Sequence, residues 1–319
     1  MPASTPTFDD ILAAAARIAP HAHTTPVLHS RELDAMAGCS VHFKAEPLQR
    51  GGAFKFRGAC NAVWALSDDA AKRGVVTHSS GNHGAALALA AQTRGIPCHV
   101  VAPEGAVAAK LAAIARYGAV LHRCEATSAA REAACARLEA ETGASLIHPF
   151  THPHVIAGQG TAALELHNAQ GPLDAVITPV GGGGLLAGSA IAMAALAPTC
   201  RVFGAEPLGA DDTARSLAAG ERLPDFVPDT ICDGLRTPVG APNFAVLQTH
   251  DVQVLVADDQ ETIAAMRLLW QCLKLVVEPS SAVAFAALLK HRERFAGQRV
   301  GLVLSGGNVD LDALPWSRA

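Results

Sequence analysis

Short β-rich runs alternate with alanine-rich segments along most of this chain, and the alternation restricts the possible folds more than any other feature. In the first half, the runs predict strands over 74–80, 98–103, 119–124 and 145–149, and the segments between them predict helices over 82–93, 107–117 and 127–142. Strands separated by one helix are typical of βαβ crossovers, which place the strands parallel in a single sheet. This half of the chain therefore predicts a parallel sheet covered by helices.

The same rhythm returns in the second half of the chain. Here the pattern predicts strands over 174–180, 201–207, 252–257 and 299–306, and helices over 185–197, 211–219, 259–273 and 280–291. Two series of this kind indicate two sheets. We therefore predict an α/β protein with two parallel-sheet domains. The smaller domain, residues 74–151, is inserted in a larger one formed by residues 1–73 and 152–319.

The composition supports a large core and excludes several classes of protein. Half of the 319 residues are apolar and 17% are charged, which argues against extended disorder. The formal net charge is −4 and no basic block is present, so we expect no nucleic-acid partner. Residues 175–200 carry no charge, but two prolines and four consecutive glycines interrupt them, which favours a buried strand, a turn and a buried helix over a membrane span.

The cysteines and the first residues suggest where the protein works. Eight cysteines are spread along the chain without a Cys-x-x-Cys pair, which favours buried free thiols in a reducing compartment. The segment MPASTPTFDD has neither a basic region nor an apolar region of the signal-peptide type. These two features predict a cytoplasmic protein.

A glycine run, PVGGGGLLAG over 179–188, lies between a predicted strand and a predicted helix. Glycines let the backbone approach an anion, and the helix that follows presents free N–H groups to it. The run lacks the Lys-Ser/Thr pair of a P-loop and a convincing dinucleotide-binding pattern. Four glycines in a row favour phosphate binding over a tight turn that serves packing alone.

Three further motifs carry chemistry. Lys55 lies between two phenylalanines in GGAFKFRGA (51–59), and a lysine in apolar surroundings can act as a nucleophilic amine, although many such lysines only lie at the surface. The segment THSSGNHG (77–84) follows a predicted strand, where α/β sheets bind ligands, although its serines and asparagine could simply cap a helix. The segment LSGGN (304–308) also follows a predicted strand.

The combination and order of these motifs resemble the fold-type II pyridoxal-phosphate (PLP) enzymes, whose fold is of the tryptophan synthase β type. The likeness is greatest to the serine/threonine dehydratase and serine racemase family, including threo-3-hydroxyaspartate ammonia-lyase. It extends from TPV (25–27) to SGGNVDL (305–311).

The resemblance implies a role for each residue that matches the family's cofactor site. Lys55 would hold PLP as a Schiff base and would then remove the Cα proton of the substrate. Asn82 would bind the 3-oxygen of the pyridine ring, and the neutral hydroxyl of Ser305 would face the ring nitrogen, which favours elimination over transamination. The phosphate would be held by backbone N–H groups of Gly181, Gly182, Gly183, Gly184 and Leu185.

The resemblance also implies a substrate site. Ser79, Ser80 and His83 match the loop that receives the substrate carboxylate, and Ser80 matches the acid on the opposite face of the cofactor in serine racemases. Arg131 could pair with a second substrate carboxylate, although it could equally be a solvated helical arginine. At residue 150 this chain has Phe where racemase relatives tend to have Asn.

A divalent-cation site is implied by AEPLGADD (205–212), which resembles the family's metal loop. Glu206 and Asp212 would supply carboxylates and Ala210 a carbonyl oxygen, a set that suits Mg²⁺, or alternatively Ca²⁺ or Mn²⁺. An acidic surface turn is the other interpretation. Glu278 matches a family position near the cofactor ring, but the sequence assigns it no role. The histidines of HPFTHPH (148–154) fit a crossover between domains better than a zinc site.

These features predict a PLP-dependent dehydratase, an ammonia-lyase that converts L-serine, L-threonine or 3-hydroxyaspartate into a 2-keto acid and ammonia. A serine racemase with side elimination is the alternative within the family, and a non-catalytic nucleotide-binding protein is the alternative from another class. By resemblance we expect a small amino-acid substrate and a homodimer.

Overall fold

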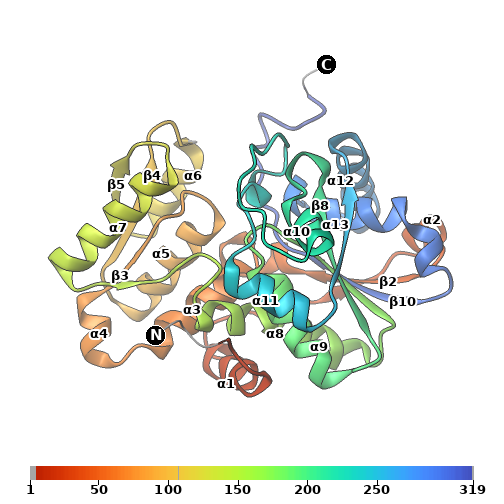
Figure 1. The fold of residues 1–319 in the computed structure, drawn as a ribbon, viewed down its shortest axis with the longest axis horizontal. Coiled ribbons are helices and arrows are strands. Elements are labelled where there is room, and N and C mark those ends of the chain that lie inside the picture. Colours follow the sequence, from red (N-terminus) through yellow and green to blue (C-terminus); the bar gives the residue numbers. More distant parts are fainter. Residues whose placement is uncertain (1–4, 107, 318–319) are drawn as a thin grey trace.

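The computed structural model describes residues 5–106 and 108–317, which form two parallel sheets covered by helices. Figure 1 shows the smaller sheet on the left, in orange to yellow, and the larger sheet on the right. The predicted α/β class with two parallel sheets is confirmed.

The larger sheet has six strands and contains the second series of predicted strands. Its order is β1 (Val27–Leu28), β2 (Ser40–Ala45), β10 (Arg299–Leu304), β7 (Ala175–Pro179), β8 (Arg201–Pro207) and β9 (Gln253–Ala257). All neighbouring strands are parallel except the short β1, which pairs antiparallel with β2.

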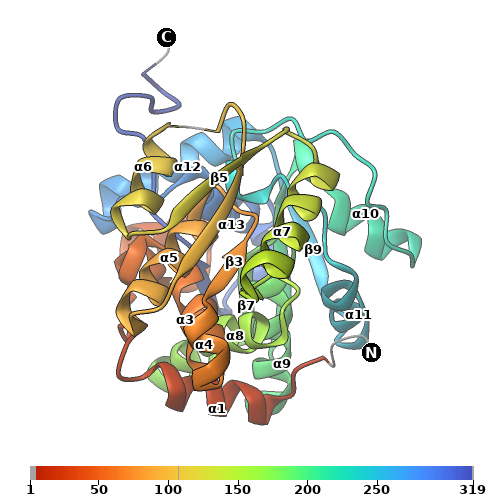
Figure 2. The ribbon, with the colours of Figure 1, turned by 90° about the vertical axis from the view of Figure 1, so that its left-hand side faces the viewer.

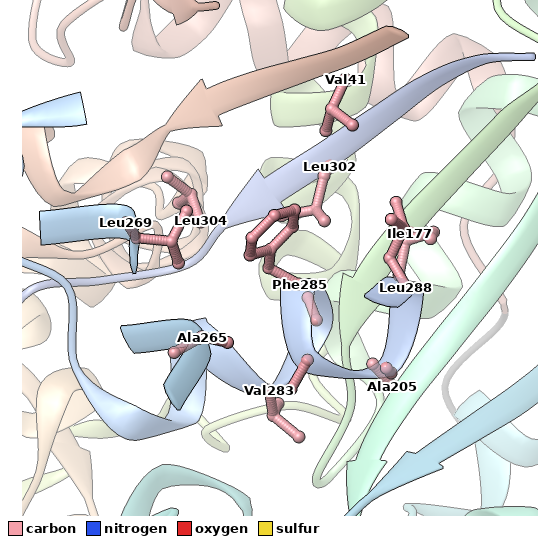
Figure 3. Close-up of a cluster of buried hydrophobic side chains, with 14 of the residues drawn as sticks. Val41, Ile177, Ala205, Ala265, Leu269, Val283, Phe285, Leu288, Leu302 and Leu304 are labelled. Carbon is pink, nitrogen blue, oxygen red and sulfur yellow. The ribbon is translucent and has the colours of Figure 1, made fainter. Parts of the chain in front are cut away.

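Helices cover both faces of this sheet, so its strands are apolar on both sides. One face carries α2 (Arg31–Ala37), α12 (Asp259–Leu273) and α13 (Pro279–Lys290), and the other carries α1 (Phe8–Ile18), α8 (Pro153–Gln170), α9 (Gly184–Leu196) and α11 (Ala241–Thr249). Along β7, Ala175 and Ile177 belong to the first face and Val176 to the second. In Figure 3, Phe285 of α13 lies among Leu302 and Ile177, which shows how this helix packs on the sheet.

The smaller sheet has four parallel strands in the order β5 (Val120–Cys124), β4 (Cys98–Pro103), β3 (Val75–Thr77) and β6 (Ser145–Leu146). One face packs on α3 (Lys55–Ala65), α5 (Asn82–Arg94) and α6 (Ala108–Arg116), and the other packs on α7 (Ser128–Thr142). Figure 2 shows α5 and α7 on opposite sides of β3 and β5. The remaining helices are α4 (Asp68–Arg73) and α10 (Asp212–Ala219), with short 3₁₀ turns that include η1 (Glu46–Leu48) and η2 (Arg50–Gly52).

The strands and helices predicted from the alternation are found within a few residues of the expected bounds. The first residue of the helix predicted over 107–117 lies outside the described residues. The strand predicted over 145–149 ends at Leu146, and the chain then runs to α8. The alternation predicted no element before residue 74, over 153–170 or over 241–249, where β1, β2, α1 to α4, α8 and α11 form.

The boundaries at residues 74 and 151 stay a prediction. The four strands of the smaller sheet lie between them, but its buried core also takes in Phe56, Cys60 and Val63 of α3. Eight cysteines are free, and six of them are buried. Across 5–106 and 108–317, no helix combines the length and the apolar character needed to cross a bilayer.

Four charged side chains meet where α3 packs against the larger sheet. Arg57 is fully buried, and its guanidinium makes two hydrogen bonds of 2.7 and 2.8 Å to Glu46 and two of 2.7 Å to Glu165. Lys44 of β2 completes the group with a 2.6 Å bond to Glu165. Two cations and two carboxylates thus neutralise one another, and they tie α3, which begins at Lys55, to β2, η1 and α8.

Removing Arg57 should destabilise the protein strongly. Arg57→Met leaves Glu46 and Glu165 without their main partner, and an uncompensated buried charge costs about 3–5 kcal/mol. Lys72→Met is the matched control because the Lys72–Asp69 pair is exposed, and such pairs contribute roughly 0–1 kcal/mol. Urea denaturation measures the free energy of unfolding of both variants. Equal losses would contradict the role assigned to the buried group.

Candidate active site

The motifs singled out in the sequence follow the carboxyl ends of parallel strands, where open α/β sheets bind ligands. The segment 78–81 follows β3, the glycine run follows β7, and Ser305 follows β10. The strand β2 leads through η1 and η2 to Lys55. Both sheets therefore contribute loops to one region.

Lys55 is the first residue of α3, and its amine is held by the segment that leaves the smaller sheet. Its Nζ donates a hydrogen bond of 3.1 Å to the carbonyl oxygen of Pro149 and lies 5.1 Å from the ring centroid of Phe54. Burial lowers the pKa of Lys55 to about 8, against the opposing effect of the Glu278 carboxylate. A fraction of this amine is therefore unprotonated near neutral pH, as a nucleophile or a base requires.

A chain of hydrogen bonds holds Asn82 at the start of α5. Its Nδ2 donates to Oε1 of Glu278 (2.9 Å), and its Oδ1 accepts from Nδ2 of Asn308 (3.0 Å). Asn308 also donates to the carbonyl oxygen of Gly51 (2.8 Å). The chain fixes the orientation of the Asn82 amide and leaves its second N–H for another acceptor. Glu278, which the sequence left without a role, is thus the residue that positions Asn82.

Ser305 is buried beside the segment that precedes Lys55. Its carbonyl oxygen accepts a 2.9 Å bond from the N–H of Phe54, and the neighbouring Gly306 pairs with Ala53. Gly306 also allows the close approach of Glu278, because a Cβ there would lie 2.7 Å from Oε1. The predicted residues Lys55, Asn82 and Ser305 are therefore brought together.

The glycine run forms a tight loop at the start of α9. Gly183 has φ +89°, which disfavours other residues, and a Cβ on Gly182 would lie 2.3 Å from the ring of Phe150. No side chain caps α9, so the N–H groups of its first turn, which includes Gly184 and Leu185, are open to a ligand. An uncapped helix N-terminus behind glycines is a site for an anion.

The loop before α5 has a similar construction. Ser79 and Ser80 are partly buried, and no side chain caps the helix. His83 is 2% exposed, and its Nε2 lies 3.2 Å from the carbonyl oxygen of Ile147. The His83 ring therefore points into the core, so any contact of this residue with a ligand carboxylate would come through its backbone N–H. Burial holds the pKa of His83 well below its ordinary value.

Aromatic rings connect this loop to the glycine run. The ring centroids of His78 and His148 are 4.9 Å apart, and those of His148 and Phe150 are 4.5 Å apart. Burial lowers the pKa of His78, and the positive charge of Arg131 on α7 lowers it further. The Nε of Arg131 itself donates a 3.4 Å hydrogen bond to the carbonyl oxygen of Thr127, at the start of its own helix.

Glu206 and Asp212 are fully buried at the end of β8 and the start of α10. Burial raises the pKa of Glu206 to about 8, with a further rise from Asp212, and burial raises that of Asp212 to about 6. Asp212 Oδ2 accepts from the N–H of Val239 (2.9 Å), whereas its Oδ1 has no partner among the described residues. Ala210 is buried beside them. The described part of the chain holds no cluster of three or more His, Cys, Asp or Glu residues suited to a metal.

Sequence reasoning missed several residues of this site. Pro149 and Phe150 were quoted only within HPFTHPH and for the Phe150 side chain, and Asn243 was not quoted at all. The contacts of the two carbonyl groups with Lys55 and Asn243 join distant segments, which a sequence pattern does not show. Asn308 was quoted within the LSGGN motif, but its contact with Asn82 spans 226 residues of sequence. Only the position of Asn308 beside the glycines after a strand could have indicated it.

Comparison with known proteins identifies the family. A model described as pyridoxal-phosphate dependent enzyme matches residues 18–306. The chain belongs to this family. It is 48% identical over 312 residues to the β-hydroxyaspartate dehydratase of Paracoccus denitrificans (strain Pd 1222), covering 98% of this chain and 99% of that one.

The racemase and deaminase branches are also similar to this PLP enzyme. The serine racemase of Dictyostelium discoideum is 47% identical and its crystal structure has a TM-score of 0.93, covering 97% of this chain and 100% of that one. The structure of maize serine racemase is 44% identical with a TM-score of 0.95, covering 97% of this chain and 95% of that one. A threonine deaminase crystal structure is 45% identical with a TM-score of 0.91, covering 96% and 99%. The predicted family and fold type are therefore confirmed.

The residues of the site fit PLP. The glycine loop and the uncapped start of α9 suit its phosphate, since a Cβ on Gly182 or Gly183 would crowd the loop. The amine of Lys55, whose pKa is about 8, suits an aldehyde. The free N–H of Asn82 suits the 3-oxygen of the ring.

Gly183→Ala should weaken PLP binding. An alanine at residue 183 would have to adopt a φ of +89°, and its Cβ would lie 2.9 Å from the Cβ of Asn243. Gly220→Ala is the matched control, because Gly220 has φ +75° but no atom within 4 Å of a Cβ. Both variants should lose about 1–2 kcal/mol of stability from the backbone conformation. Only Gly183→Ala should bind PLP more weakly in a titration, and equal PLP affinities of the two variants would refute the assignment of the glycine loop to the phosphate.

Proposed function

We propose that this PLP enzyme is an ammonia-lyase that converts β-hydroxy amino acids, 3-hydroxyaspartate above all, into a 2-keto acid and ammonia. The observation that carries the proposal is the 48% identity to a β-hydroxyaspartate dehydratase over nearly the whole chain. Arg131 of α7 is the candidate for the second carboxylate of that substrate, and its charge helps burial to lower the pKa of His78 in the loop expected to receive the first one. The nucleotide-binding alternative is set aside because the chain belongs to the PLP family.

Lys55 is proposed as the residue that carries the cofactor and moves the Cα proton. Bound PLP supplies an electron sink that makes the Cα proton of an amino acid acidic. The pKa of about 8 leaves part of the Lys55 amine neutral and able to accept this proton, and Pro149 orients the amine through its carbonyl oxygen.

Ser305 and Asn82 are proposed to hold the ring of the cofactor from two sides. A hydroxyl at Ser305 does not keep the ring nitrogen protonated as a carboxylate would, which favours loss of the β-substituent over transamination. The amide of Asn82 is oriented by Glu278 and Asn308, so it can donate its free N–H to the 3-oxygen. The backbone of Gly181 to Leu185 is proposed to bind the phosphate.

The substrate carboxylates are proposed to bind at the loop before α5. Ser79, Ser80 and the backbone N–H of His83 lie at an uncapped helix N-terminus, which favours an anion. A second carboxylate on the β-carbon, which serine lacks, would be bound by Arg131. Burial lowers the pKa of His78, His83 and His148, which favours their neutral forms, so Arg131 and not one of these histidines is proposed to bind this carboxylate.

Arg131→Gln should change substrate preference. We expect the wild type to release keto acid from L-threo-3-hydroxyaspartate with a higher kcat/KM than from L-serine, L-threonine or the erythro diastereomer. Loss of the guanidinium should lower kcat/KM for 3-hydroxyaspartate roughly ten- to hundredfold, because charged hydrogen bonds contribute about 1.5–3 kcal/mol. The value for serine should change little.

Two variants control this experiment. Arg137→Gln removes an exposed arginine from the same helix and should leave every kcat/KM unchanged. Lys55→Ala should abolish keto-acid release. When the protein is incubated with PLP and reduced with borohydride, the peptide that contains residue 55 should gain the mass of PLP in the wild type but not in Lys55→Ala. If Arg131→Gln lowers kcat/KM equally for serine and for 3-hydroxyaspartate, the proposed substrate preference is wrong, but the proposed lyase activity is not affected.

Serine racemase is the second candidate activity. The 47% identity to the Dictyostelium discoideum serine racemase favours it, and Ser80, partly buried before α5, is proposed as the acid on the face opposite Lys55. Phe150, which lies against Gly182, stands where racemase relatives tend to have Asn and argues for elimination as the main reaction. Formation of D-serine and of pyruvate can be followed in the same reaction.

We further propose a divalent cation, Mg²⁺ or alternatively Ca²⁺ or Mn²⁺, at Glu206, Asp212 and the carbonyl of Ala210. Burial raises the pKa of both carboxyl groups, and a bound cation would stabilise their ionised forms. Oδ1 of Asp212 has no other partner among the described residues. The resemblance also implies a cytoplasmic homodimer, which stays a proposal testable by sedimentation and cell fractionation.

Mg²⁺ should stabilise the protein in a pH-dependent way. Because folding raises the pKa of Glu206, the metal-free protein should lose stability as the pH rises toward about 8, where the carboxyl releases its proton. The cation competes with that proton, so its effect on Tm should grow over the same range and EDTA should reverse it. Asp212→Asn should abolish the response, whereas Asp211→Asn, in the same loop, should keep it. No response to either reagent would exclude the site.

A further inference from the structure

Asn243 lies on α11, fully buried behind the glycine loop. Its side-chain nitrogen donates to two backbone carbonyl groups, that of Gly182 at 2.6 Å and that of Phe150 at 2.9 Å. Because both contacts are acceptors, the amide can take only one orientation, with its nitrogen toward the two carbonyls. No motif in the sequence singles out this residue.

The contact with Gly182 orients the peptide group that follows it. The carbonyl of Gly182 also accepts a 3.1 Å bond from the N–H of Gly240, so it is held from the side of α11. In a trans peptide the carbonyl and the next N–H point in opposite directions. The N–H of Gly183 is therefore directed away from Asn243.

The contact with Phe150 reaches the segment that holds Lys55. The carbonyl of Pro149, one residue earlier, accepts the hydrogen bond from Lys55 Nζ. The Asn243 amide thus connects the glycine loop to the backbone segment 149–150, whose Pro149 carbonyl accepts the hydrogen bond from Lys55. Gly183 permits this arrangement, since a Cβ there would lie 2.9 Å from Cβ of Asn243.

The oxygen of the same amide indicates that stability alone does not explain the residue. Oδ1 of Asn243 is buried and has no hydrogen-bond partner among the described residues. A buried polar atom without a partner destabilises a fold. An asparagine here is therefore best explained by what its two N–H groups do for the carbonyls of Gly182 and Phe150.

We propose that Asn243 is a positioning residue, which presents the N–H groups of the glycine loop to the cofactor phosphate and keeps that loop in register with Lys55. The inference rests on the proposed role of the glycine loop as the phosphate site. It deepens that proposal by naming the group that shapes the loop.

The experiment measures PLP binding separately from turnover. Full-length protein, freed of PLP with hydroxylamine, is titrated with PLP for wild type, Asn243→Ala, Asn243→Asp and the control Asn61→Ala. Asn61 is an equally buried asparagine whose Nδ2 donates to a backbone carbonyl, that of His154, away from the glycine loop. The Tm of each apoprotein and the ³¹P chemical shift of bound PLP are recorded alongside.

We expect Asn243→Ala to raise the apparent Kd for PLP about tenfold or more, since two hydrogen bonds are lost, and to move the ³¹P resonance. Asn243→Asp should weaken binding further, because a carboxylate would face two carbonyl oxygens. Asn61→Ala should lower the Tm of the apoprotein but leave the Kd and the resonance as in wild type.

Retained PLP affinity with an unmoved resonance in Asn243→Ala would overturn the inference, even if its Tm falls. If Asn243→Ala does not fold, Asn243→Ser carries the same test, because its hydroxyl can donate one of the two bonds. An unchanged PLP affinity in Gly183→Ala would instead refute the proposed phosphate site itself. The two failures are thereby distinguished.

Discussion

The hydrogen bond from Lys55 Nζ to the carbonyl of Pro149 is the contact on which the site depends. Lys55 begins a helix that packs on the smaller sheet, and Pro149 lies on the segment that leaves that sheet for α8. The next carbonyl, that of Phe150, is bound by Asn243, which also binds Gly182. The lysine, the crossover and the glycine loop are thus fixed to one another by neighbouring backbone groups.

Two groups of buried charged side chains, one around Arg57 and one around Glu206 and Asp212, differ in how their charges are compensated. Around Arg57, two cations and two carboxylates balance, and the group holds α3 in place. Around Glu206 and Asp212, burial raises the pKa of both carboxyl groups, and the hydrogen bonds that they accept from the described residues come from backbone N–H groups and not from a cationic side chain. The first arrangement is complete within the chain, whereas the second suits an added ion.

The candidate site combines a few chemically necessary side chains with many backbone groups. Lys55, Asn82, Ser305 and the glycine run could be named from the sequence because their chemistry requires particular residue types in a particular order. Asn308 and Asn243 could not be identified as site residues from the sequence, because an asparagine after a strand or within a helix can serve many structural roles. The role of Glu278 became visible only through its bond to Asn82, 196 residues away in the sequence.

The sequence by itself determined the α/β class, the strands and helices of both series and the motifs that identify the family. Periodicity is a local property, so strands such as 98–103 and helices such as 259–273 could be predicted from it. Only the tertiary structure decided that α3 packs on the smaller sheet, that the ring of His83 turns into the core and that Asn243 shapes the glycine loop. These features depend on contacts between distant segments, which packing and hydrogen bonding select only when the whole chain has folded.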